Sequence, residues 1–107
     1  MPTNYQRGRQ FEYRTRNKLI DMGAVYVMRA AQSKGKVDLL ALWPEAAMYE
    51  PQVPWIVQCK RDGRLPKAER EALLELHHQC HAIPILAKTG PNGRGVEFID
   101  LRDGRKS

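Results

Sequence analysis

The chain has 107 residues, with 18 Lys and Arg against 12 Asp and Glu, and a formal net charge of +6. This length accommodates one domain of about 13 Å radius, which excludes a two-domain enzyme with a separate cofactor-binding fold. A hydrophobic fraction of 42% is enough for one packed core and argues against wholesale disorder. The basic balance favours a polyanionic partner, most often nucleic acid, although many basic proteins bind none.

Signals for export or membrane insertion are missing from the sequence. No apolar run reaches the roughly 18 residues of a membrane span, and the opening MPTNYQRGRQ lacks the apolar stretch of a secretory signal. Cys59 and Cys80 form no CxxC pair, which favours a reducing compartment. We therefore expect an intracellular protein, cytoplasmic or nucleoid-associated, or a viral protein in the host cytoplasm, with no membrane partner.

The first expected element is a helix that begins at Thr3 or Asn4, whose side chains suit an N-cap. Phe11, Leu19 and Met22 recur in it at helical spacing, with Thr15 between them. Gly23 follows and suits a left-handed helix end. Three strands are expected next, over residues 24–29, 37–42 and 55–60.

The second half predicts a turn, a helix and two strands. Pro66 is well placed to open a helix over 66–80, because proline fits a first turn. Strands are expected over 83–88 and 96–101, and the tail 102–107 is expected to fray. The order α-β-β-β-α-β-β predicts one α/β domain, with its core over about residues 5–101 and a central mixed sheet of about five strands flanked by helices.

Polar residues interrupt two strands that otherwise belong to the core. Asp38 lies among apolar neighbours, and a buried carboxylate is costly unless it is paired or binds a metal. Gln58 and Lys60 share one face of their strand by the two-residue period. Carboxylate and amide oxygens suit Mg²⁺, and a nearby ammonium stabilises charge on a reacting phosphate. The pattern is typical of a metal-dependent nuclease, but an ordinary Asp–Lys ion pair across two strands explains it as well.

The positive charge is concentrated at the start of the chain. Residues 1–40 contain eight Lys and Arg and three Asp and Glu. Glu12 and Asp38 lie inside this basic block. The block predicts either a solvated basic face or a phosphate-binding surface beside a metal site.

Taken together, these residues resemble the PD-(D/E)XK nuclease superfamily and, within it, the archaeal-type Holliday junction resolvases. The similarity runs over about residues 5–101. The matching segments are Arg7-Gly8, Phe11-Glu12, Gly23 to Arg29, Ser33 to Asp38 with Gly35, Gln58-Cys59-Lys60, and the helix and strand over 66–88.

The resemblance implies a restriction-endonuclease-like fold and a homodimeric, Mg²⁺-dependent endonuclease that nicks four-way DNA junctions, with Mn²⁺ able to substitute. By position, Asp38 would be the main metal ligand, Glu12 a helical ligand and Lys60 the catalytic lysine. Ser33 would lie in the loop that places the DNA strand. The residues that would hold DNA phosphates are Arg7, Arg9, Arg16, Arg29, Lys34 and Lys36.

One position departs from the family pattern, because Gln58 stands where the family has glutamate. An amide oxygen can still ligate Mg²⁺ but brings no charge, which leaves two carboxylates in the expected site. Gln58 is then a tolerated variant, the mark of slow turnover, or the mark of a DNA-binding module that does not cut. A different nuclease of the superfamily, acting on duplex, flaps or ends, is the other alternative.

A histidine-rich segment closes the second helix. His77, Cys80 and His81 share a helical face, but no second Cys/His pair elsewhere completes a zinc site. The segment therefore favours helix packing or charge near a helix C-terminus. For Trp43 and Trp55 we expect core packing or a dimer surface rather than base stacking.

Overall fold

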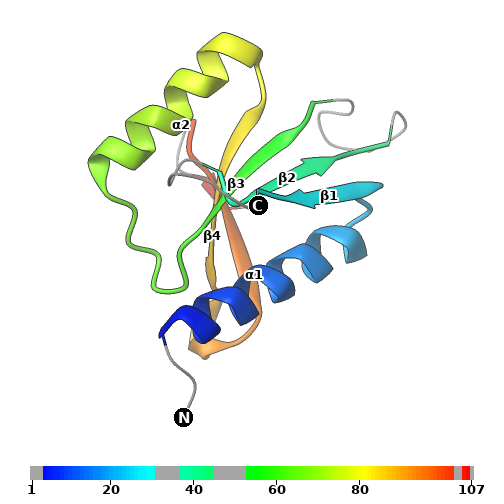
Figure 1. Ribbon diagram of the computed structural model, residues 1–107, viewed down its shortest axis with the longest axis vertical. Coiled ribbons are helices and arrows are strands. Elements are labelled where there is room, and N and C mark those ends of the chain that lie inside the picture. Colours follow the sequence, from blue (N-terminus) through cyan, green and yellow to red (C-terminus); the bar gives the residue numbers. More distant parts are fainter. Residues whose placement is uncertain (1–3, 31–36, 45–52, 103–104, 107) are drawn as a thin grey trace.

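A computed structural model describes residues 4–30, 37–44, 53–102 and 105–106. Two helices and six strands follow one another in the predicted order, with a short sixth strand added (Figure 1). The elements are α1 (Asn4–Asp21), β1 (Tyr26–Arg29), β2 (Leu39–Leu42), β3 (Trp55–Cys59), α2 (Lys67–Cys80), β4 (Ile83–Thr89), η1 (Pro91–Gly93), β5 (Val96–Asp100) and β6 (Arg105–Lys106).

The strands form one mixed sheet in the order β1-β2-β3-β4-β5-β6. Only β3 and β4 pair in parallel, and the other neighbours are antiparallel. The parallel pair requires a crossover connection, which α2 provides. The predicted mixed α/β sheet is confirmed. The tail that was expected to fray instead contributes β6, which pairs with Ile99 and Asp100 of β5.

The two helices cover opposite faces of the sheet, so the core has two layers (Figure 1). On one face, Phe11 and Leu19 of α1 pack with inward residues of β2 to β5. On the other face, Leu73 of α2 packs with Ile56 and Leu86. Neither α1 nor α2, the helices of the described residues, is long and apolar enough to cross a membrane.

Helix α1 buries the stripe that its periodicity predicts, with one exception. Thr15 is fully buried between Phe11 and Leu19, and its hydroxyl donates to the Phe11 carbonyl at 2.8 Å. Gly23 has a φ of +114°, a backbone conformation that favours glycine at the helix end. Met22, expected on the buried stripe, is 42% exposed because it follows the last helical turn.

The histidines close α2. His81 adopts the left-handed conformation, and its N–H donates to the His77 carbonyl at 2.8 Å. The His77 ring nitrogen Nδ1 lies 3.0 Å from the Ala82 carbonyl oxygen. Across the described ranges, no three His, Cys, Asp or Glu side chains are grouped to hold a metal ion. The geometry thus agrees with the packing and capping interpretation of this segment.

Both tryptophans pack against the α1 face of the sheet. The ring centroids of Trp43 and Trp55 lie 4.8 Å apart, and those of Trp55 and Phe98 lie 5.9 Å apart, both with edge-to-face geometry. The core-packing expectation therefore agrees with the structure.

Leu73 tests the docking of α2, because it is the fully buried side chain of this helix. Replacing it with alanine removes buried apolar contacts and leaves a cavity. We expect Leu73→Ala to lower the free energy of unfolding by about 2–5 kcal/mol in urea denaturation. Glu75→Ala on the exposed side of the same helix should stay within about 0.5 kcal/mol of the wild type. Equal losses in the two variants would contradict the packing described for α2.

Candidate active site

Asp38 lies at the start of β2, one residue before the strand begins at Leu39. Its backbone N–H donates to the Val57 carbonyl at 2.9 Å. Its carboxylate oxygen Oδ2 accepts a 2.8 Å hydrogen bond from the backbone N–H of Cys59. The Asp38 side chain is therefore held against β3 at the residue between Gln58 and Lys60.

Gln58 and Lys60 lie on the α2 face of the sheet. In the parallel register, Gln58 pairs with Leu86, which belongs to the α2-side core. Lys60 follows β3 and its ammonium nitrogen Nζ lies 3.3 Å from Glu69 on α2. This agrees with the predicted alternation. The sequence also allowed an ion pair between Asp38 and Lys60, but Lys60 pairs with Glu69 instead.

Burial raises the pKa of the Asp38 carboxyl above its ordinary value. The Cys59 N–H and the Lys60 ammonium oppose this effect, whereas the negative charges of Glu12 and Glu69 add to it. Burial likewise raises the pKa of the Cys59 thiol, and the Asp38 charge adds to it. The ionised form of Asp38 is therefore less favoured than that of an exposed aspartate.

Gln58 is the second unusual group. The residue is only 3% exposed, and its amide oxygen Oε1 has no hydrogen-bond partner within the described part of the chain. An unsatisfied buried acceptor costs about 1–3 kcal/mol. Together with the Asp38 carboxylate, this oxygen matches the hard donors that Mg²⁺ prefers. The residues present therefore fit a divalent cation.

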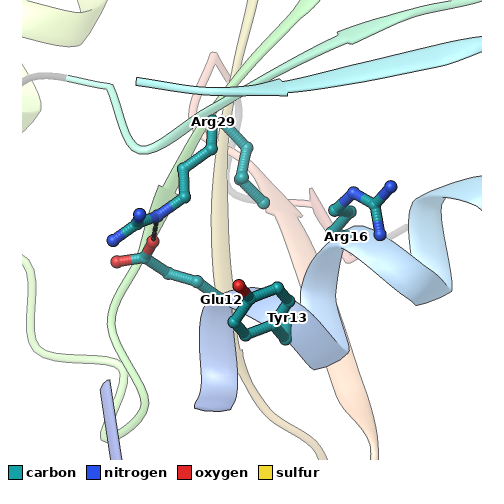
Figure 2. A pocket seen from close by; sticks show the side chains of 5 residues that line it. Glu12, Tyr13, Arg16 and Arg29 are labelled. Carbon is teal, nitrogen blue, oxygen red and sulfur yellow. Dashed lines mark hydrogen bonds and ion pairs between the residues drawn. The ribbon is translucent and has the colours of Figure 1, made fainter. Parts of the chain in front are cut away.

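Glu12 lies on α1 and faces β1. Its carboxylate oxygen Oε1 accepts a 2.9 Å hydrogen bond from Arg29 Nε. Figure 2 shows this pair beside Tyr13 and Arg16 of α1, where the side chains line a pocket with Leu39. Glu12 is close enough to act on the Asp38 charge but is engaged by Arg29. Its expected role as a metal ligand stays a prediction.

The expected DNA-binding residues are described only in part. Arg7 is half-buried, and Arg9 and Arg16 are exposed along α1. Ser33, Lys34 and Lys36 lie outside the described residues.

Glu69 is a residue of the site that the sequence does not single out. It lies in KAERE, whose alternating charges are typical of a solvated helix face, so nothing in the pattern separates Glu69 from Glu71. The available signal was its position, because Glu69 lies in the first turn of the helix that follows β3.

Comparisons with known proteins identify a solved structure with a similar fold. No family model and no curated protein matches the sequence. Among solved structures, the chain is similar to Hjc, a Holliday junction resolvase from the archaeal hyperthermophile Archaeoglobus fulgidus. The TM-score is 0.64 at 19% sequence identity, over 90% of this chain and 74% of that chain. The likeness confirms the predicted fold class, that of a Holliday junction resolvase.

Asp38→Asn tests the electrostatic cost of the site. The amide keeps an acceptor for the Cys59 N–H but removes the buried charge. Because the pKa of Asp38 is raised on folding, its ionised form destabilises the folded state at every pH above that pKa. We therefore expect a higher Tm for Asp38→Asn at neutral pH in EDTA, by calorimetry. The difference should shrink as the pH falls through the raised pKa, where the wild-type carboxyl is also neutral.

Asp62→Asn is the matched control, since Asp62 is an exposed turn residue that also accepts a backbone N–H, from Arg64. Its Tm should not follow that pattern. A lower Tm for Asp38→Asn at neutral pH would contradict burial as the dominant influence on Asp38.

Proposed function

We propose that this protein is a metal-dependent endonuclease that acts on branched DNA and resolves Holliday junctions by paired nicks. One observation carries the proposal. A partly buried carboxylate and a buried, unpartnered amide oxygen lie near a lysine, at the start of β2 and the end of β3, in the fold of a resolvase. Such a grouping is costly to folding and is explained by a cation and a phosphate that use it.

Asp38 and Gln58 are the residues that would hold Mg²⁺, or Mn²⁺ in its place. When bound, the cation would polarise the scissile phosphate and lower the pKa of a bound water. Lys60 presents its ammonium at the same end of β3, where it offsets negative charge on the phosphate. Glu69 fixes the direction of the Lys60 side chain through the 3.3 Å contact. The Cys59 N–H holds the Asp38 carboxylate in place.

The basic residues of α1 and β1 support a DNA surface beside this site. Arg16 and Arg29 line the same pocket as Glu12 (Figure 2), and Arg9 and Arg7 lie three and five residues before Glu12 on α1. Arginine guanidinium groups position phosphates without reading bases. Branch selectivity would then come from the shape of the DNA, with Ser33, Lys34 and Lys36 as further contacts.

A homodimer is part of the proposal. Two symmetric nicks at a four-way junction require two active sites, and each chain carries one. A two-fold dimer places them symmetrically. We expect the protein in the cytoplasm or associated with the nucleoid, or, if it is viral, in the host cytoplasm.

Gln58 favours a second candidate, a DNA-binding module that does not cut. The neutral amide supplies less charge to a cation than a glutamate would. This candidate keeps the basic surface and the fold but predicts no hydrolysis.

A cleavage assay on four-way junctions, flaps and linear duplex separates these functions. We expect Mg²⁺-dependent paired nicks in the junction while linear duplex is spared. Asp38→Asn should reduce cutting by about a hundredfold or more, because it removes the charged metal ligand, and should leave junction binding nearly intact in a mobility-shift assay. Undiminished cutting by this variant would remove Asp38 from the site. Equal cutting of flaps or linear duplex would indicate another nuclease, and binding without cutting in saturating Mn²⁺ would indicate the binding module.

Gln58→Glu tests the departure from the family pattern. The added charge should tighten Mn²⁺ binding by about tenfold in calorimetric titration, with cleavage retained. Gln79→Glu, on the exposed surface of α2, is the control and should not change the affinity. Unaltered Mn²⁺ affinity in Gln58→Glu would place the cation away from Gln58.

A further inference from the structure

The Glu69 carboxylate is partly buried beside Lys60, the residue that follows β3. The sequence pattern of its helix is instead typical of an exposed surface. Glu69 belongs to the first turn of α2. Its two carboxylate oxygens each lie 3.3 Å from Lys60 Nζ, and its side chain is only 26% exposed. By contrast, the side chain of Glu71 on the same helix is 64% exposed and lies 4.0 Å from an exposed Lys67. Glu69 is therefore held toward the sheet.

The charges around Asp38 are unbalanced. Glu12 and Glu69 both act on the Asp38 carboxylate, from the α1 and α2 layers respectively. Glu12 has a guanidinium partner in Arg29, and Glu69 has the ammonium of Lys60, whose charge also acts on Asp38. Two carboxylates against one ammonium leave a net negative charge in a partly buried place, which a cation would neutralise.

Gln58, two residues before Lys60, independently indicates a ligand on the same face of the sheet. Its side chain lies on the face that α2 covers, as Lys60 and Glu69 do. Its amide oxygen is buried and unpartnered. This oxygen can contact a cation but contributes no charge, so the charge must come from another residue.

On the basis of the proposed function, we propose that Glu69 is a further metal-binding residue of this site. From α2 it supplies the negative charge that Gln58 does not supply from β3. The cation is a divalent, oxygen-preferring ion of the Mg²⁺ and Mn²⁺ class, held by Asp38 and Glu69 with the neutral oxygen of Gln58.

The test is calorimetric titration of the full chain with Mn²⁺ in the absence of DNA. Glu69→Gln should weaken Mn²⁺ binding by about tenfold or more, as expected when a charged metal-binding residue is lost. Glu71→Gln should stay within about twofold of the wild type, because its carboxylate is exposed and away from Lys60. The double variant Gln58→Glu with Glu69→Gln should return to near wild-type affinity, since it moves the charge from α2 back to β3.

A second comparison separates a metal-binding role from an effect through Lys60. Glu69→Gln also removes the partner of the Lys60 ammonium, whose charge would then repel a cation. In a Lys60→Met background that repulsion is absent. The proposal expects the same loss of about tenfold when Glu69→Gln is added to Lys60→Met. No loss in this background would overturn it, because Glu69 would then act only by neutralising Lys60.

The outcomes also distinguish this inference from the proposed function. If Glu69→Gln binds Mn²⁺ like the wild type while Asp38→Asn does not, the role of Glu69 is overturned and the nuclease proposal stands. If the wild type binds no Mn²⁺ at any concentration, the metal-dependent function fails and the role of Glu69 fails with it. A double variant that stays weak would also overturn the inference, provided that circular dichroism shows it folded.

Discussion

The hydrogen bond from the Cys59 backbone N–H to the Asp38 carboxylate is the contact on which the site depends. At 2.8 Å it ties the start of β2 to the end of β3. Glu69 of α2 contacts Lys60, the residue that follows Cys59. Without this contact, the Asp38 carboxylate would have no fixed position relative to Gln58 and Lys60. The rest of the fold supports it, since β3 pairs with β2 on one side and β4 on the other.

The groups of the site lower the folding stability of a small protein. The site holds a carboxyl whose pKa is raised by burial, and an amide oxygen with no partner in the described chain. A domain of this size has a net stability of only about 5–15 kcal/mol. The two apolar layers provide the stability that tolerates these groups, because Phe11 and Leu19 seal one face and Leu73 seals the other. Strained or unsatisfied groups that persist in this way mark functional sites more often than structural ones.

Local patterns in the sequence predict most of the fold. The helical period of Phe11, Thr15 and Leu19 predicts the buried face of α1, because spacing within one helix decides which side chains share a face. Pairings across the chain are different. Arg29 with Glu12 and Lys60 with Glu69 join separate elements, and no local pattern reports them. The same limit explains β6, which forms because β5 offers an unpaired edge rather than through any strong strand pattern of its own.

We propose that a divalent cation binds at Asp38 and Gln58, where β2 meets β3. Anomalous diffraction from crystals soaked in Mn²⁺ tests it most directly, because the peak locates the ion without reference to activity. We expect a peak in contact with a carboxylate oxygen of Asp38 and the amide oxygen of Gln58. A peak elsewhere in the molecule, or none at a concentration that supports DNA cleavage, would contradict it.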